Sequence, residues 1–421
     1  MGIHLVVLVH GLWGTVAHFD YVSRQLVKYG AVIHEQGDVL SVSGDKTVVY
    51  RTTTNQGYFT YDGIDVCGTR VANEITSEVS FLDESSGTIV DRISIMGYSL
   101  GGLVSRYAAG VLHRRGFFKT VRPITFTTFC TPHVGVVVLS EHWTARAFNG
   151  IGSVSMASTS KQLFLTDRYR DTHGPLLLYM SDPKGPFYQA LQQFEAVSLY
   201  ANVVNDHRCE YYTAGISSVD PFQGRTRHIR GPFVEGYKPT VLDLGDQKLM
   251  FEENEAEEPK RGPVLASIGY YSVALAKIMF VIPLWFVAFA LNATYQNVVS
   301  SFRQRAFRKQ GWMDEVDMGP SIVERLEEGA DDVVESMYRA VTDAETASVD
   351  DEPQKLQLDN TQLTIIDRLN TLNWKKYPVH ITQHSHAHAA VLVRYKSPGF
   401  NEGKLVVKHW IESTLGLDRV D

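Results

Sequence analysis

Short apolar runs alternate with segments of helical spacing along the first half of the chain. The helical spacing covers Phe19–Tyr29 and a segment from Asp65 to Glu78, with Asp65 as its expected N-cap. This alternation predicts an α/β protein with a mostly parallel sheet and helices on both faces. The runs typical of buried strands are His4–Val9, Lys46–Arg51, Ile93–Met96, Ile124–Cys130 and Ala196–Val204.

A glycine-flanked serine follows the third of these runs. Gly97-Tyr98-Ser99-Leu100-Gly101-Gly102 joins the apolar run to a helix of small residues. A serine on such a strand–turn–helix is the nucleophile of many hydrolases, because glycines on both sides let strand and helix pass closely. The alternative is a plain glycine–serine turn.

A second glycine-rich turn, His10-Gly11-Leu12-Trp13-Gly14, follows the first apolar run. In a serine hydrolase a loop at this place turns a backbone N–H toward the oxyanion, and the residue after the nucleophile supplies another. Leu12 and Leu100 are therefore the candidate oxyanion-hole residues. The alternative is a strand-end turn without chemistry.

Length, charge and cysteine content limit the kinds of protein this chain can be. The 421 residues suffice for one large domain with insertions or for two domains, and 44% of them are hydrophobic. The net charge of −7, without a long basic block, argues against a nucleic-acid partner. Three cysteines without framework spacing favour a reduced, cytosol-facing protein.

Five motifs in order resemble a family of fungal serine esterases with the α/β-hydrolase fold, which includes the lipid-droplet phospholipase of yeast. The resemblance covers about residues 1–225 and resumes near 365–412. It implies an esterase that acts on lipids without a cofactor. The motifs are His10-Gly11-Leu12-Trp13-Gly14, Tyr61-Asp62-Gly63-Ile64, Gly97–Gly102, Thr131-Pro132-His133-Val134-Gly135 and Tyr200–Asp206.

The serine needs a histidine base and a carboxylate, which follow it in the order acid, then histidine, in this fold. Asp206 comes directly after the Ala196–Val204 run and resembles the family's acid segment, although Cys209-Glu210 stands where a Val-Pro pair is usual. Asp220, before Pro221, is the alternative acid.

The resemblance places the base at His388, two residues before an apolar run that ends in Arg394. His386 is the second candidate. A metal site is a further alternative, since His384, His386 and His388 would share one face of an extended strand after the predicted strand Tyr377–Thr382. The segment holds no acidic or cysteine ligand to complete such a site.

The predicted organisation has three parts. Residues 1–225 form the hydrolase core with a cap near 140–195, and 226–362 form an insertion with acidic linkers. Residues 363–421 complete the core, carry His388 and end in a helix over Gly403–Leu415.

The insertion contains an apolar segment, 264–291, followed by Arg303, Arg305, Arg308 and Lys309. It is long enough to span a bilayer, which takes about 20 residues. One crossing would separate His388 from Ser99, and two would need about 40 apolar residues. We therefore expect the segment to dip into a membrane or lie in its interface, with a buried cap as the alternative.

Together these observations predict a serine esterase or lipase that cleaves acyl esters of glycerolipids, including phospholipids. Its expected location is a cytosol-facing membrane surface, a lipid droplet or the endoplasmic reticulum. The alternatives are an acyl thioesterase or transacylase of the same fold, and a non-catalytic membrane adaptor. No metal or other cofactor is expected.

Overall fold

The computed structural model describes residues 2–38, 45–137, 139, 143–169, 174–222, 229–245, 249–251, 282–310 and 356–419. Within them, seven strands form one sheet in the order β2-β3-β1-β4-β5-β6-β9, and every neighbouring pair is parallel. This confirms the predicted parallel sheet. The strands are β1 (Ile3–Val9), β2 (Val32–His34), β3 (Lys46–Arg51), β4 (Val90–Tyr98), β5 (Arg122–Phe129), β6 (Ala196–Asn202) and β9 (Trp374–Val379), with an antiparallel pair β7 (Ile229–Gly231) and β8 (Met250–Phe251) apart from the sheet.

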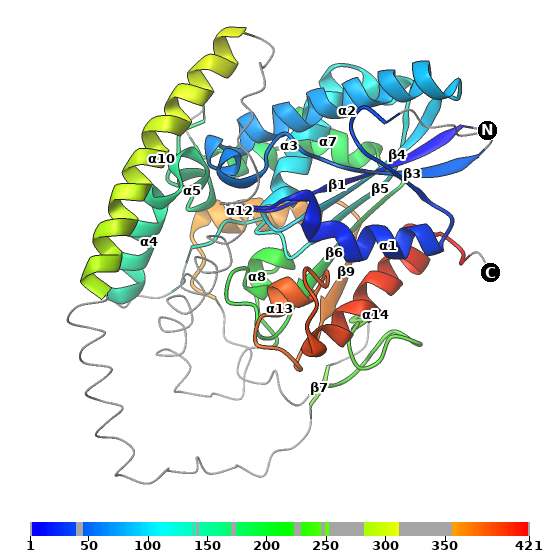
Figure 1. The fold of residues 1–421 in the computed structure, drawn as a ribbon. Helices are drawn as coiled ribbons and strands as arrows, with labels where there is room; N and C mark the ends of the chain where they lie inside the picture. The colour runs from blue at the N-terminus through cyan, green and yellow to red at the C-terminus, as the bar shows by residue number, and fades with distance from the viewer. Residues whose placement is uncertain are drawn as a thin grey trace.

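Helices cover both faces of the sheet, with α2, α3 and α7 on one face and α1 and α14 on the other (Figure 1). The α-helices of the described residues are α1 (Asp20–Lys28), α2 (Ile64–Ser86), α3 (Leu100–Arg114), α4 (Trp143–Ser155), α5 (Ala157–Leu163), α6 (Leu176–Met180), α7 (Pro186–Gln193), α8 (Tyr211–Ala214), α10 (Ile282–Gln310), α12 (Asn360–Asn370), α13 (Ala387–Ala390) and α14 (Asn401–His409). Shorter turns are the 3-10 helices η1 (Val16–Phe19), η2 (Gly57–Asp62), η3 (Phe117–Lys119) and η5 (Pro398–Phe400) and the π-helical turn η6 (Trp410–Thr414).

The register brings the carboxyl ends of the central strands together. Val9 of β1 pairs with Gly97 of β4, and Gly97 pairs with Thr128 of β5. Every residue of β1 is buried, as its unbroken apolar run predicts for a central parallel strand. The loops that follow β1, β4 and β5 therefore emerge side by side at one edge of the sheet, which is where ligands bind in open α/β folds.

Several local predictions need correction. Helix α2 begins at Ile64 after Gly63, so Asp65 lies inside the first turn and accepts a hydrogen bond from Gln162 Nε2 at 2.8 Å. Asp65 is therefore not the N-cap. The strand β2 was not predicted, because three residues are too few to show a period.

Near the C-terminus the strand is displaced from its predicted position, whereas the predicted terminal helix is present. Strand β9 begins at Trp374 and ends at Val379, so it leaves His380–Thr382 in a loop. The terminal helix α14 ends at His409 and continues as the π-helical turn η6.

The helices of the predicted cap near 140–195 pack in two different places. Helix α7 belongs to the layer over the sheet, where the Phe187 ring lies 4.6 Å from that of Tyr107 in α3. Helices α4 and α5 instead pack against α10, at the end of the molecule where the strands finish (Figure 1).

The insertion is described only in part. Residues 264–281 of the predicted membrane segment, and most of the acidic linkers 242–261 and 343–360, lie outside the described residues. Residues 282–291 form the first turns of α10. Among the described residues, no helix combines the length and apolar character that crossing a bilayer requires.

Asp62 fixes α10 to the hydrolase core. Its carboxylate is fully buried and accepts hydrogen bonds from Arg70 Nη2 at 2.7 Å and from Ser300 Oγ of α10 at 2.6 Å. Arg303 of α10 donates to the same carboxylate through Nε, at 3.0 Å to Oδ2, and through Nη2, at 2.8 Å to Oδ1. Two arginines and a hydroxyl thus share one buried carboxylate.

We expect Asp62→Asn to lower the free energy of unfolding by about 3–5 kcal/mol, because the neutral amide leaves Arg70 buried without a counter-charge. The measurement is urea unfolding at neutral pH. Asp20→Asn is the matched control, since the Asp20 carboxylate that pairs with Arg51 is about half exposed, and it should cost only about 0–1 kcal/mol. Equal losses from the two variants would contradict this account.

Candidate active site

Ser99 lies at the tip of the turn between β4 and α3. Its backbone has φ 55° and ψ −129°, a left-handed conformation that residues other than glycine seldom adopt. Ser99 N donates to Phe129 O at 2.8 Å, so the end of β5 holds the turn in place. The side chain is partly exposed, as a nucleophile must be.

The flanking glycines are required by close contacts. A Cβ atom on Gly101 would lie 2.2 Å from Val9 O and 2.4 Å from His10 O. A Cβ atom on Gly97 would lie 2.4 Å from the Cα atom of Gly102. Helix α3 therefore passes directly against the end of β1, and this contact sets the angle of the turn.

His388 Nε2 lies 3.0 Å from Ser99 Oγ, and the other ring nitrogen, Nδ1, lies 2.9 Å from Asp206 Oδ2. The histidine and the carboxylate are both buried. The structure thus brings together the serine, the first-choice base and the first-choice acid, in the geometry of a nucleophile–base–acid triad.

Asp206 is held as a carboxylate. Burial alone would raise its pKa. The charge and hydrogen bonds of His388 outweigh this effect and lower the pKa, and hydrogen bonds from Asn202 Nδ2 and the Cys209 N–H add to the lowering. The bond from position 209 uses a backbone N–H, so cysteine in place of the usual valine keeps it. Asp206 is therefore ionised at neutral pH and can fix the His388 tautomer.

The alternative acid and the alternative base make other contacts. The Asp220 carboxylate accepts the N–H of Phe222 at 2.9 Å within its own turn. His386 is the N-cap residue of α13, and its N–H donates to His384 Nδ1 at 3.0 Å. The three histidines are therefore not on an extended strand, and the geometry assumed for the three-histidine metal site is wrong.

A different cluster could be considered for a metal. Cys130, Asp206 and His388 have potential ligand atoms within 4.8 Å of one another. Burial keeps Cys130 protonated by raising its pKa, and His388 Nδ1 is hydrogen-bonded to Asp206. A thiolate and a free imidazole nitrogen are what a metal would need, so this donor set fits the triad better than a metal.

The His10–Gly14 loop lies against the nucleophile. A Cβ atom on Gly11 would be 2.8 Å from Ser99 Cβ, and the loop closes on itself through Gly14 N to Gly11 O at 3.0 Å. Burial lowers the pKa of His10 to about 4, so its ring is neutral at neutral pH. Leu12 is the next residue of this loop after Gly11, and Leu100 is the first residue of α3, where N–H groups have no partner within the helix.

Sequence reasoning missed the residues that position the triad. Tyr98 Oη donates to His388 O at 2.7 Å, and Asn202 Nδ2 donates to Asp206 Oδ2 at 2.9 Å. Ala387 N donates to Asn205 O at 3.1 Å and joins the acid loop to the base loop. All but Ala387 lie inside the quoted motifs, so the motifs themselves were the available signal.

We expect Gly101→Ala to lower the free energy of unfolding by about 1–3 kcal/mol, because the end of β1 must move away from α3. Urea unfolding measures the change. Gly150→Ala in α4 is the control, since no atom lies within 4 Å of the added carbon. It should gain up to about 1 kcal/mol from helix propensity. A Gly101→Ala variant as stable as the wild type would contradict the close contact.

Asp206→Asn should reduce the free energy of unfolding at pH 7 by about 1–3 kcal/mol, because it removes a charged hydrogen-bond acceptor from a buried network. A carboxylate whose pKa is lowered by folding stabilises the protein above its unfolded pKa of about 3.9. Its contribution is lost as the pH falls through the folded pKa. Urea unfolding should therefore show the full gap between wild type and variant at pH 7 and 5.5, and this gap should begin to narrow near pH 4 and close under stronger acid. A gap that closes near pH 6 would contradict the lowered pKa.

The comparisons with known proteins identify the family of this chain. The family model described as "Putative serine esterase (DUF676)" matches residues 1–219. Similar curated proteins include "Putative lipase C4A8.10" of Schizosaccharomyces pombe, which is 28% identical over 65% of this chain and 35% of that protein. "Putative lipase ROG1" of Saccharomyces cerevisiae is 32% identical over 52% of this chain and 29% of that protein. The chain thus spans about a third of the length of these relatives.

Among solved structures, the chain is similar to "the putative cell surface hydrolase from Lactobacillus plantarum WCFS1". That match has 12% identity and a TM-score of 0.30, and it covers 51% of this chain and 74% of that one. Phospholipase PlaB from Legionella pneumophila matches with 12% identity and a TM-score of 0.27, over 50% of this chain and 41% of that one. The parallel sheet, with the nucleophile on the turn after β4 and with the acid and the base after β6 and β9, is the arrangement of the α/β-hydrolase fold. With more than half of its residues matched by the family model, the chain belongs to the family described as "Putative serine esterase (DUF676)".

Proposed function

We propose that this protein is a lipid-surface serine hydrolase that cleaves acyl esters of glycerolipids, including phospholipids. The observation that carries the proposal is the continuous hydrogen-bonded path from Ser99 Oγ through His388 to Asp206. The curated relatives are each named "putative lipase", and these names support a lipid ester as substrate.

The reaction follows from the positions of the atoms. Ser99 Oγ attacks the ester carbonyl while His388 Nε2 takes its proton, and Asp206 stabilises the imidazolium that forms. The backbone N–H groups of Leu12 and Leu100 would stabilise the oxyanion, at about 3 kcal/mol for each donor.

The second half of the reaction uses the same base. His388 returns the proton to the leaving alcohol, which departs from an acyl-enzyme on Ser99. Water activated by His388 then releases the fatty acid and restores the serine.

The proposed location is a cytosol-facing membrane, the endoplasmic reticulum or a lipid droplet, with residues 264–291 in the lipid interface. In sequence this segment lies between Asp206 and His388, which contact one another. A single crossing of the bilayer would separate those two residues. A segment that enters and leaves on one side is compatible with their contact.

We expect a fluorophosphonate probe to label the wild-type protein and to leave Ser99→Ala unlabelled, because the probe captures only an activated serine. The same two proteins are assayed with a panel of glycerolipids and phospholipids for released fatty acid. Asp206→Asn should slow labelling by about 10⁴-fold, as in other triads that lose the carboxylate. Asp220→Asn is the matched control and should label at the wild-type rate.

Two outcomes would overturn the proposal. Absence of labelling, or labelling that survives Ser99→Ala, favours a non-catalytic adaptor. Labelling with acyl transfer to an added alcohol or thiol, and no release of fatty acid, favours a transacylase.

A further inference from the structure

Helix α10 has its polar and apolar faces reversed. Its inward side carries Gln296, Ser300 and Arg303, of which the first two are buried. Its outward side carries Leu291, Tyr295, Val298 and Phe302, each 51–68% exposed. A helix on the surface of a water-soluble domain turns its apolar stripe inward, so this arrangement suits a helix whose outer face meets an apolar environment.

The inward polar face holds α10 in this orientation, because its side chains are hydrogen-bonded to the core. Arg303 and Ser300 bind the Asp62 carboxylate, and Gln304 Nε2 donates to Ser158 Oγ of α5 at 2.9 Å. Turning α10 over would leave the buried Asp62 without these partners, at a large cost. The apolar side is therefore held outward.

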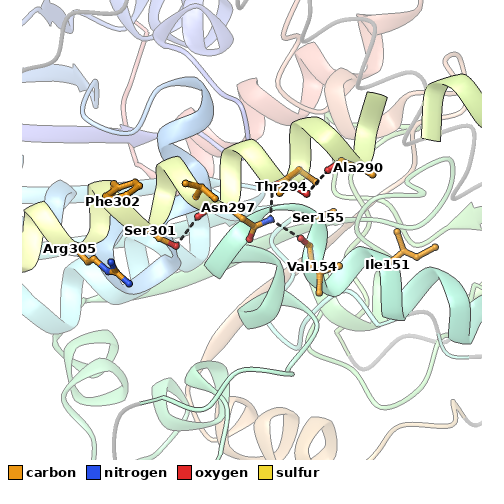
Figure 2. Close-up of a pocket in the computed structure, with 11 residues that line it drawn as sticks. Ile151, Val154, Ser155, Ala290, Thr294, Asn297, Ser301, Phe302 and Arg305 are labelled. Carbon is orange, nitrogen blue, oxygen red and sulfur yellow. Dashed lines mark hydrogen bonds between the residues drawn. The ribbon is translucent and has the colours of Figure 1, made fainter. Parts of the chain in front are cut away.

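Helix α4 extends the apolar surface. Six of the ten large hydrophobic side chains that are exposed among the described residues lie on α4 and α10, which makes this a patch and not a scatter. Between the two helices runs an open groove of about 760 Å³, and none of its lining residues belongs to the triad (Figure 2). The six are Ile151, Val154, Leu291, Tyr295, Val298 and Phe302.

The polar side chains in the groove are occupied by the helices themselves. Asn297 Nδ2 donates to Val154 O at 3.1 Å, and Ser301 Oγ donates to Asn297 O at 2.8 Å (Figure 2). Thr294 Oγ1 donates to Ala290 O at 2.8 Å. With these donors satisfied, the groove offers a partner mainly apolar contact.

The charge of α10 indicates which apolar partner fits. In a chain of net charge −7, this helix has four basic residues and no acidic one. Arg303 is turned toward Asp62, whereas Arg305, Arg308 and Lys309 are exposed at the end of the apolar face. An apolar face with basic residues beside it is typical of binding to anionic lipid surfaces.

We propose that the outer face of α10, together with Ile151 and Val154 of α4, docks the protein on a surface of anionic phospholipid. The proposal rests on the lipid-surface part of the proposed function and is independent of the acyl chemistry.

Docking on this face would bring the active site to the lipid. Helix α10 stands beyond the carboxyl ends of the strands (Figure 1). Ser99 follows the end of β4, so it lies at the same edge of the sheet. It contacts η2, whose Tyr61 Oη accepts a hydrogen bond from Trp13 Nε1 at 2.9 Å. Trp13 belongs to the loop that lies against Ser99, so one connected set of residues joins the docking face to the site.

The test is co-sedimentation of the full chain with phosphatidylcholine vesicles, with and without phosphatidylserine. We expect the wild type to bind more tightly when phosphatidylserine is present. Val298→Asp combined with Phe302→Asp should weaken binding by about 100-fold or more, because it removes two apolar side chains from the lipid contact. Arg305→Gln combined with Arg308→Gln should weaken binding by about fivefold per residue on the anionic vesicles only.

The matched control is Val27→Asp combined with Ile89→Asp, two exposed apolar residues outside the patch, and it should bind as the wild type does. Urea unfolding in the absence of lipid checks that each variant, Ser99→Ala included, is folded. Ser99→Ala should bind vesicles as the wild type does. Failure of the enzymatic proposal would therefore appear in the labelling assay, and failure of the docking proposal would appear in vesicle binding.

Three results would overturn the docking proposal. One is a wild type that does not bind the anionic vesicles, and another is a double variant, Val298→Asp with Phe302→Asp, that binds as tightly as the wild type. The third is a wild-type dimer in analytical ultracentrifugation that the same double variant converts to monomer, with vesicle binding unchanged, which assigns the face to a second copy of the chain.

Discussion

The contact between His388 and Asp206 is the constraint on which the rest of the site depends. It joins residues 182 positions apart, one in the loop after β6 and the other in helix α13, which follows β9. Those strands pair with Asn202 opposite Val379, so the two loops leave the sheet together. The sheet register thus brings Asp206 and His388 near one another, and a few polar contacts fix the orientation of their side chains. Because both partners are buried, removing either would leave the other with an unsatisfied hydrogen-bonding group away from water.

The turn at Ser99 depends on a different kind of constraint. There the backbone of α3 comes so close to the end of β1 that only a hydrogen atom fits at Gly101. This contact brings the His10–Gly14 loop to the same place as the serine. Nucleophile and candidate oxyanion donors are therefore positioned by one packing contact, while base and acid are positioned by strand pairing.

Asp62 links these catalytic elements to the surface. One buried carboxylate holds Arg70 of α2 and Arg303 of α10, and the same η2 turn holds Trp13 through Thr60 and Tyr61. An ion cluster around a buried carboxylate contributes little net stability compared with apolar packing, but it fixes geometry. Here it keeps the apolar side of α10 turned outward, and this gives the Tyr61–Ile64 motif a structural role.

The sequence by itself determined the parallel α/β architecture, the Ser99 turn and the first choices of acid and base, because apolar periodicity and glycine spacing are local properties. The choice between Asp206 and Asp220, and between His388 and His386, needed the tertiary structure, since distances across 182 residues depend on strand register. The wrong N-cap at Asp65 and the wrong extended histidine segment have the same cause: side-chain partners such as Gln162 and the start of α13 come from packing. The outward apolar face of α10 was also beyond the sequence, because hydropathy shows which residues of a helix are apolar and only the contacts of Asp62 show which side faces the core.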